Sequence, residues 1–146
     1  MQHSASVMSG GEPIARLAAV FQALSEPTRL RIMALVCRAG RDLCVCEFVD
    51  ALEEAQYHVS RSLKILQKAG LVAERREGRW VHYGVAARLD VVRRLVLRAV
   101  AAIPHQVLAR DQRELNRRLK LREHGQCLVG VQKTQLLSRR NRELLR

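Results

Sequence analysis

Apolar residues recur at intervals of three and four positions in five segments of this chain, which is the spacing of helices that bury one face. The segments span residues 14–24, 27–37, 42–52, 56–69 and 89–103. Local signals set some of their ends: Pro27 suits the first turn of the second helix, Gly40 breaks the chain after it, and Asp42 is a suitable N-cap for the third. The pattern therefore predicts a mainly helical domain.

Two shorter segments interrupt the helical pattern. Residues 71–75 and 80–85 are rich in strand-forming side chains and flank Glu77 and Gly78, which predicts a β-hairpin. Two helices, a turn, a basic helix and a hairpin in this order describe a winged helix-turn-helix. The predicted fold class is mainly α with a two-stranded β-wing, formed by residues 14–103.

The two ends of the chain lie outside this predicted domain. Residues 1–13 are expected to form a flexible N-terminus, and residues 104–146 a basic, partly helical C-terminal extension. Within the extension, residues 107–122 keep a helical pattern, whereas residues 126–146 indicate a solvated basic tail that adds nonspecific DNA affinity in the sharper interpretation. From residue 110 onward there are eleven Arg and Lys against four Asp and Glu.

The apolar stripe of segment 89–103 has no partner left within the domain. Paired with the first helix, residues 14–24, it is the kind of face that a symmetric dimer buries. We therefore expect a homodimer formed through the first and last helices of the domain, which suits a palindromic DNA site.

The charge of the chain indicates its partner. The 26 Lys and Arg against 14 Asp and Glu give a net charge of +12, which attracts polyanions such as nucleic acid. Aromatic residues make up 3%, too few to stack many bases of a single strand, so double-stranded DNA is expected. No apolar run approaches the roughly 20 residues of a membrane helix, and no secretory signal begins the chain. A cytoplasmic protein without a membrane partner is expected.

Four cysteines carry the candidate chemistry: Cys37, Cys44, Cys46 and Cys127. Three of them lie within ten positions, which in a reducing compartment indicates a metal or redox site rather than a disulfide framework. Thiolates select soft, thiophilic ions. The chain has neither the C-x-x-C spacing nor the α/β pattern of thiol-exchange enzymes. No catalytic triad, phosphate loop or carboxylate pair stands out either, so we do not expect an enzyme.

Four sequence segments resemble one known family: ALSEPTRLRIMALV, DLCVCEFVDAL, HVSRSLKILQKAGLV and EGRWVHY. In this order and spacing, over about residues 14–103, they are similar to the arsenic- and metal-responsive winged-helix repressors of the ArsR/SmtB family. The resemblance implies a homodimeric repressor that occupies operator DNA without ligand and leaves it when a soft ion binds its thiolates. The C-V-C element resembles that of members that sense arsenite, antimonite, cadmium or lead.

The same resemblance makes SRSLKILQKAGLV the recognition helix and RREGRWVHY the wing. The residues expected to contact DNA are Gln56, His58, Ser60, Arg61 and Lys64 in the groove, with Arg75, Arg76 and Arg79 in the wing. Glutamine suits adenine and arginine suits guanine. Trp80 and Tyr83 are expected to pack within the hairpin rather than to stack on bases.

A trivalent pnictogen requires three sulfur ligands, and many family members place the third cysteine where this chain has Val49. Cys37 and Cys127 remain as candidates, and Cys37 is favoured because closing a short loop costs less entropy than ordering a long tail. The expected metal site is therefore Cys37, Cys44 and Cys46, with As(III) or Sb(III) as effector and no organic cofactor. Cys127 is expected to be a surface thiol, or else a ligand from a tail that folds on binding.

Helix geometry suggests how such a site would act on DNA. Residues two apart on a helix point about 200° apart, so Cys44 and Cys46 reach one ion only if the first turn of their helix distorts. That distortion would shift the recognition helix. Three alternatives remain open: a cadmium- or lead-responsive repressor, a thiol redox-sensing regulator that responds to peroxide without any metal, and an architectural DNA-binding protein without a ligand.

Overall fold

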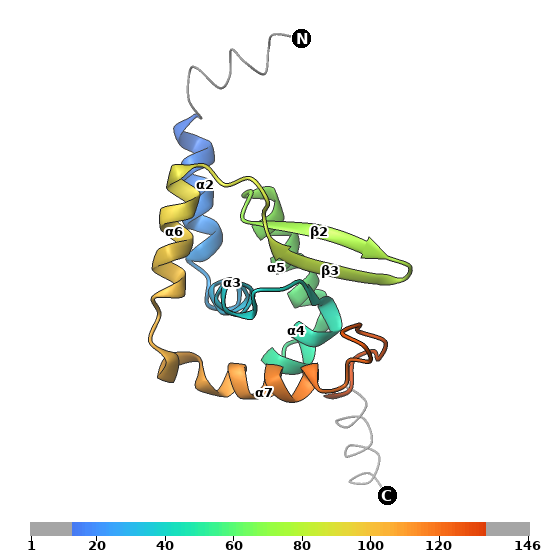
Figure 1. Ribbon diagram of the computed structural model, residues 1–146. Helices are drawn as coiled ribbons and strands as arrows, with labels where there is room; N and C mark the ends of the chain where they lie inside the picture. The colour runs from blue at the N-terminus through green and yellow to red at the C-terminus, as the bar shows by residue number, and fades with distance from the viewer. Residues whose placement is uncertain (1–12, 134–146) are drawn as a thin grey trace, which may run out of the picture.

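The computed structural model describes residues 13–133, which form a group of helices from which the hairpin of a small antiparallel sheet projects (Figure 1). In chain order the elements are α2 (Ile14–Leu24), α3 (Pro27–Ala39), β1 (Leu43–Cys44), α4 (Val45–Leu52), α5 (Gln56–Lys68), β2 (Val72–Glu77), β3 (Trp80–Val85), α6 (Val91–Ala101), the 3₁₀ turn η1 (His105–Leu108) and α7 (Ala109–Leu119). The predicted winged helix-turn-helix is confirmed, with α4 and α5 as the helix-turn-helix and β2 and β3 as the wing.

The helix ends show why these segments fold as they do. At the start of α3 the Glu26 carboxylate accepts hydrogen bonds from the backbone N–H groups of Thr28 and Arg29, and Pro27 occupies the first turn. Gly40 ends this helix in the left-handed conformation, with φ 62°. The predicted N-cap of the next helix was wrong: Cys44, not Asp42, is the N-cap of α4.

The helix begins later than predicted because the residues before it form a third strand. Leu43 and Cys44 form the two-residue strand β1, which pairs antiparallel with β3, so the sheet order is β1-β3-β2 rather than a two-stranded hairpin alone. Leu43 lies opposite Tyr83 and Cys44 lies opposite His82. A strand of two residues has no periodicity of its own, so the hydrophobic pattern did not predict it.

The core lies between α3, α4, α5 and the inner face of the sheet. Its largest fully buried side chains include Ile32, Phe48, Leu63, Leu66 and Leu71. A shared core of this kind fixes the angle between the two helices of the helix-turn-helix, and it positions the outer face of α5 for contacts with another molecule.

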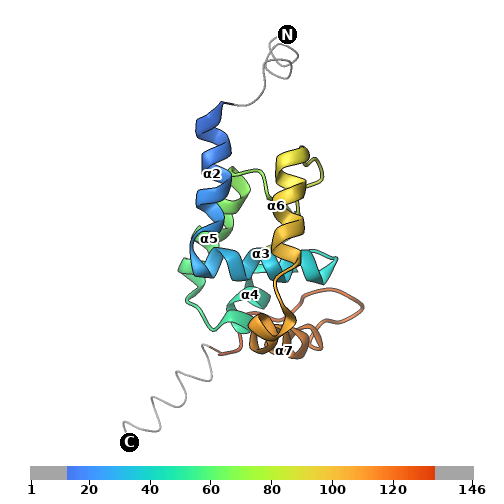
Figure 2. The ribbon, with the colours of Figure 1, turned by 90° about the vertical axis from the view of Figure 1, so that its left-hand side faces the viewer.

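Helices α2 and α6 stand on the side of the molecule that faces the viewer in Figure 2. Four large apolar side chains on them are exposed: Ile14 by 81%, Phe21 by 56%, Val91 by 59% and Leu95 by 57%. Exposed apolar side chains of this number on two neighbouring elements are typical of a surface that another chain covers. Dimer formation through these helices stays a prediction.

The C-terminal extension packs against the helix-turn-helix. Helix α7 lies along α4, with Leu115 fully buried, and the chain then turns back over the beginning of α4 (Figure 1). The solvated tail predicted from residue 126 was therefore wrong for residues 126–133, where Cys127 is 2% exposed and the backbone N–H groups of Gln132 and Lys133 donate to Asp50. The predictions for residues 1–12 and 134–146 lie outside the described residues.

No helix within residues 13–133 is long and apolar enough to cross a membrane.

Candidate metal centre and nucleic-acid interface

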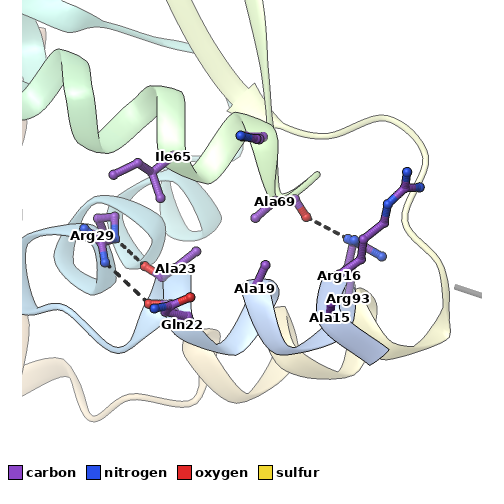
Figure 3. A pocket seen from close by; sticks show the side chains of 10 residues that line it. Ala15, Arg16, Ala19, Gln22, Ala23, Arg29, Ile65, Ala69 and Arg93 are labelled. Carbon is purple, nitrogen blue, oxygen red and sulfur yellow. Dashed lines mark hydrogen bonds between the residues drawn. The ribbon is translucent and has the colours of Figure 1, made fainter. Parts of the chain in front are cut away.

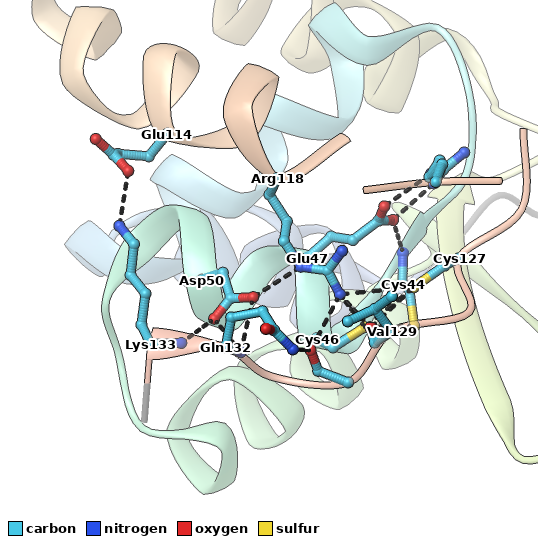
Figure 4. Close-up of polar contacts among 12 residues, drawn as sticks. Cys44, Cys46, Glu47, Asp50, Glu114, Arg118, Cys127, Val129, Gln132 and Lys133 are labelled. Carbon is cyan, nitrogen blue, oxygen red and sulfur yellow. Dashed lines mark hydrogen bonds and ion pairs between the residues drawn. The ribbon is translucent and has the colours of Figure 1, made fainter. Parts of the chain in front are cut away.

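Three cysteine sulfurs meet at the beginning of α4 (Figure 4). The Sγ atom of Cys46 lies 3.1 Å from that of Cys44 and 3.2 Å from that of Cys127, and all three sulfurs lie within 4.8 Å of one another. All three residues are buried. We call Cys44, Cys46 and Cys127 the sulfur cluster.

Cys44 and Cys46 converge because Cys44 is not part of the helix. As N-cap it has an extended backbone, with φ −76° and ψ 149°, and its N–H donates to the Glu47 carboxylate at 2.8 Å. Side chains two residues apart point about 200° away from each other only when both residues are helical. The expectation that the first turn must distort to bring both sulfurs together was therefore wrong, since the undistorted helix start already brings them into contact.

The third sulfur comes from the C-terminal extension. Residues 123–126 form a turn, with His124 and Gly125 in the left-handed conformation, that directs Cys127 back onto α4. Cys37, the favoured candidate from the sequence, lies near the end of α3, is partly exposed and does not belong to the sulfur cluster. The loop-entropy argument for Cys37 fails because packing of α7 already orders the chain that leads to Cys127.

Two arginines of the extension lie beside the sulfur cluster, and no pattern in the sequence indicated either of them. Arg118 is 4% exposed, and its Nη2 lies 3.4 Å from the Cys46 sulfur and 3.9 Å from the Cys127 sulfur. Its Nε donates to the Asp50 carboxylate at 2.7 Å. The guanidinium thus favours negative charge on sulfur while it ties the extension to α4.

Arg122 forms the second ion pair at this site. It donates to both carboxylate oxygens of Glu47, at 2.6 and 2.7 Å, and to the backbone carbonyl of Asp42 at 2.9 Å. Two carboxylates, those of Glu47 and Asp50, lie beside the sulfur cluster and are fully or almost fully buried. Because each of these carboxylates is held by an arginine, the sulfurs remain the free donors of the site.

The three thiols share their protons unequally. Hydrogen bonds from Cys44 and Cys46 hold the pKa of Cys127 at about 2, far below the ordinary thiol value, with Arg118 contributing in the same direction. The hydrogen bond with Cys127 raises the pKa of Cys44 to about 11, and the same interaction raises the pKa of Cys46. The cluster therefore holds one thiolate that is stabilised by two neighbouring thiols, a preformed set of soft donors.

The donor set fits a soft ion. Three sulfurs without a hard oxygen donor select thiophilic ions over Mg²⁺ or Ca²⁺. Two sulfurs bound tetrahedrally to zinc at about 2.3 Å would lie about 3.8 Å apart, whereas the measured separations from Cys46 are 3.1 and 3.2 Å. The sulfurs of Cys44 and Cys127 thus lie closer to that of Cys46 than two sulfurs on a zinc ion would.

The residues expected to contact DNA on α5 share its outer surface. Gln56, Arg61 and Lys64 are exposed, and His58 and Ser60 are partly exposed. The Lys64 ammonium forms an ion pair with Glu74 of β2, which reduces its free charge. The structure adds a residue that charge patterning did not indicate.

Tyr57 is this additional residue. Its side chain is 73% exposed on the first turn of α5, and its hydroxyl accepts a hydrogen bond from Arg61 at 3.3 Å. The signal that could have indicated it was a large aromatic side chain on the polar face of a basic helix. Tyr57 therefore adds an aromatic side chain to the exposed surface of α5 that Gln56 and Arg61 share.

The three arginines of the wing are less alike than the sequence suggested. Arg75 forms ion pairs with Asp42 and Glu77, both at 2.9 Å, so it joins the wing to the turn before β1. Arg76 pairs with Glu74 at 3.1 Å. Arg79, at the tip, stacks on Trp80 with its guanidinium carbon 4.7 Å from the ring centre.

A cavity of about 550 Å³ lies between α2, α5 and α6 (Figure 3). Alanines of α2 form much of its lining, and its charged groups are the side chains of Arg16, Arg29, Lys68 and Arg93. No cysteine, histidine or carboxylate is among its lining residues, so the cavity offers no donor for a soft ion.

The comparisons with known proteins agree with the fold. The model of the bacterial regulatory protein arsR family matches residues 26–74, which include Cys44 and Cys46 and end before Cys127. The arsenic resistance transcriptional regulator ArsR1 of Pseudomonas putida is 47% identical over 64 residues, which make up 44% of this chain and 49% of that protein. The match thus spans about half of that regulator.

Two further matches cover most of the other protein. An uncharacterized HTH-type transcriptional regulator of Methanocaldococcus jannaschii is 40% identical over 86 residues, which are 58% of this chain and 96% of that protein. The solved structure of the homodimeric winged helix-turn-helix DNA-binding domain of Mb0332 from Mycobacterium bovis, a possible ArsR-family regulator, matches with a TM-score of 0.51 and 26% identity. This match covers 68% of this chain and 88% of that domain.

Proposed function

Because this chain belongs to the ArsR/SmtB family of winged-helix transcriptional regulators, we propose that it is a cytoplasmic repressor that binds operator DNA as a homodimer. We further propose that it leaves the DNA when As(III) or Sb(III) is bound by Cys44, Cys46 and Cys127. The observation that carries the proposal is the meeting of three buried sulfurs at the beginning of α4, the first helix of the helix-turn-helix.

The sulfur spacing supports a trivalent pnictogen over the soft divalent ions. A pnictogen keeps a lone pair and binds three sulfurs as a pyramid, which brings the sulfurs close together. Cadmium and lead are larger and hold their sulfurs further apart, so separations of 3.1 and 3.2 Å suit them less well. The relative whose name mentions arsenic resistance, ArsR1 of Pseudomonas putida, supports the same effector class.

Contacts between the extension and the helix-turn-helix offer a route from the ion to the DNA. Glu53, in the turn between α4 and α5, forms ion pairs with Arg110 of α7 and with Lys133 at the end of the described chain. Arg31 of α3 donates two hydrogen bonds of 2.8 Å to the carboxylate of Asp111 in α7. The extension therefore holds the turn that sets the position of the recognition helix.

A second contact continues this route into α5 itself. Arg31 also reaches the Glu54 carboxylate at 3.4 Å, and the other oxygen of Glu54 lies 3.4 Å from Nδ1 of His58 in the first turn of α5. An ion bound by the sulfur cluster joins α4 to the extension through three bonds in place of weak sulfur contacts. In the proposed switch, these bonds hold α4 and α5 in a different arrangement. The two recognition helices of the dimer then cannot enter two half-sites roughly 34–36 Å apart at once.

The test is a titration of the reduced protein on a fluorescent duplex from its own promoter, with DNA release followed by anisotropy. We expect As(III) or Sb(III) to release the DNA at one ion per protomer. The matched variants are Cys127→Ser and Cys37→Ser: the first is expected to abolish release, and the second to leave it unchanged. Release that survives Cys127→Ser but is lost in Cys37→Ser would overturn the assignment of the site.

One observation favours a second candidate, a thiol redox sensor. The thiolate of Cys127 lies 3.2 Å from the Cys46 sulfur. Hydrogen peroxide would oxidise this thiolate to a sulfenic acid and release hydroxide. Attack by the Cys46 thiol would then form a disulfide and release water, so that two thiols and one peroxide give one disulfide and two waters.

The two candidates differ in what they need to release DNA. With a chelator present and no added ion, a redox sensor loses DNA on addition of peroxide and regains it with dithiothreitol. The ion sensor keeps its DNA until As(III) or Sb(III) is added under reducing conditions. The matched pair Cys127→Ser and Cys37→Ser applies to both experiments.

A further inference from the structure

His82 is a buried histidine with no role in the proposed function. Its side chain is 7% exposed, and its Nδ1 atom has no hydrogen-bond partner within residues 13–133. A buried imidazole nitrogen without a partner carries a desolvation cost, so such an atom calls for an explanation.

The register of the sheet places His82 beside the sulfur cluster. His82 of β3 lies directly opposite Cys44 of β1, and directly opposite residues of an antiparallel pair project from the same face with Cβ atoms about 4.5–5.5 Å apart. Leu43 and Tyr83, the neighbouring pair, face the hydrophobic core. Cys44 and His82 therefore share the opposite face of the sheet.

This face of the sheet is continuous with the sulfur cluster. Trp80, two residues before His82 on the same strand and thus on the same face, packs against the sulfurs of Cys44, Cys46 and Cys127. The histidine thus lies beside Cys44, buried on the face of the sheet that borders the sulfur cluster.

The other ring nitrogen of His82 faces a carboxylate. Nε2 lies 3.8 Å from a carboxylate oxygen of Glu77. Histidines that bind metal ions commonly direct their second nitrogen toward a carboxylate, which fixes the tautomer and leaves the first nitrogen as the acceptor. With its proton on Nε2, His82 presents the lone pair of Nδ1, the atom that has no partner.

We propose that His82 is the fourth donor of the sulfur cluster, used by soft divalent ions that take four ligands and left aside by three-coordinate pnictogens. The proposal rests on the sulfur cluster as the effector site of the proposed function. Zinc and cadmium would then be bound by three sulfurs and one nitrogen, a donor set common in four-coordinate zinc sites. His82 lies outside the group of three sulfurs, so its imidazole must move toward them when such an ion is bound.

This assignment gives one site two coordination modes. The close sulfurs alone complete the pyramid of As(III) or Sb(III), and His82 stays against Glu77. A four-coordinate divalent ion that is bound by the same three sulfurs still needs one ligand, and His82 is the neighbouring donor that can supply it. Binding of zinc or cadmium therefore depends on His82, whereas binding of arsenite does not.

The test measures ion affinity directly, without DNA, on reduced full-length protein. Cd²⁺ and As(III) are titrated into the parent, His82→Gln and the control His105→Gln, whose histidine lies in η1 away from the cluster. Sulfur-to-ion charge-transfer absorption and Trp80 fluorescence report binding, and ¹¹³Cd NMR reports whether nitrogen is bound. Loss of an outer-shell partner alone weakens metal binding by roughly 10–100-fold, so His82→Gln is expected to weaken Cd²⁺ binding about 100-fold.

As(III) affinity of His82→Gln is expected to equal that of the parent, which also shows that the variant is folded. Equal Cd²⁺ affinity of His82→Gln and parent, or a ¹¹³Cd shift that does not change, would overturn the fourth-donor assignment while leaving the three-sulfur site intact. Loss of As(III) binding in Cys127→Ser is the separate check on the proposed function.

A second variant covers the case in which His82→Gln does not fold. His82→Cys keeps a soft donor at this position, so Cd²⁺ is expected to bind at least as tightly as in the parent, with a ¹¹³Cd shift typical of four sulfurs. A parental shift in His82→Cys would exclude a fourth donor from this position.

Discussion

The carboxylate of Asp50 fastens the C-terminal extension to α4. It accepts a hydrogen bond from Arg118 Nε at 2.7 Å and from the backbone N–H groups of Gln132 and Lys133, each at 3.0 Å. Asp50 is 2% exposed and Arg118 is 4% exposed. The substitution Asp50→Asn removes the charge that compensates Arg118 and leaves one acceptor oxygen for three donors.

The size of the effect follows from this geometry. Breaking a buried ion pair by removing one partner costs about 3–5 kcal/mol, and the retained amide oxygen places Asp50→Asn at the lower end. A cost of about 3 kcal/mol weakens docking of the extension about 150-fold, since 1.4 kcal/mol corresponds to a factor of ten. Because α3, α4 and α5 share a core of their own, we expect local opening of the extension rather than unfolding of the whole domain.

Hydrogen exchange and arsenite affinity measure this opening. In Asp50→Asn, amides of residues 109–133 are expected to exchange faster while those of residues 27–68 keep parental rates, and As(III) affinity is expected to fall because Cys127 is no longer held in place. Asp90→Asn is the matched control, since asparagine is an equally good N-cap and this residue lies at the start of α6. Parental exchange in residues 109–133 together with parental As(III) affinity would refute the reasoning.

Three further predictions concern the DNA-binding face, the wing and the exposed helices. Glu74→Gln frees the Lys64 ammonium, so DNA affinity should rise and the slope of log affinity against log salt should steepen by about 0.9, which is checked by anisotropy at several salt concentrations. Contacts with Lys64 and Tyr83 lower the pKa of Glu74 to about 2. These contacts therefore stabilise the fold above the ordinary carboxyl pKa, and this stabilisation is lost as the pH falls toward 2. It amounts to no more than about 1 kcal/mol, because the pair is exposed. The difference in urea midpoint between parent and Glu74→Gln should shrink over this range, and a constant difference would contradict it. Leu95→Glu should convert the expected dimer to a monomer in sedimentation, whereas Val107→Glu, at a more exposed apolar position in η1, should not.

The helices and the wing could be predicted because their signals are local. Apolar spacing, Pro27 and the Glu77-Gly78 turn each act within a few residues, and the observed helices begin and end close to the predicted limits. The cap of α4 could not be predicted in this way. Asp42 has a suitable side chain, but pairing of Leu43 and Cys44 with β3 moves the start of the helix, and that pairing depends on a strand about 40 residues away in the sequence.

The sulfur cluster was predictable only in part for the same reason. Cys44 and Cys46 are close in the sequence, so both were expected in the site, but their sulfurs meet because Cys44 is the N-cap of α4 rather than a helical residue. Cys127 joins them because α7 packs on α4 and because Arg118 binds Asp50, two contacts that no local pattern records. The entropy of loop closure favoured Cys37 as the third ligand. The extension is ordered, however, by burial of Leu115 and by the ion pairs of Arg118 with Asp50 and of Arg122 with Glu47, so the cluster does not have to order it.

The division of the site between two parts of the chain bears on how its selectivity is set. The segment that matches the arsR family model contains Cys44, Cys46 and α5, while Cys127, Arg118 and Arg122 belong to the C-terminal extension. The residues expected to contact DNA lie on α5 and on the wing, apart from the extension. A substitution of Cys127 therefore changes the third sulfur of the cluster, whereas Arg110 and Lys133 of the extension pair with Glu53 in the turn before α5. Selectivity for the ion and the position of α5 thus depend on different residues of the extension, with α4 as the element that both share.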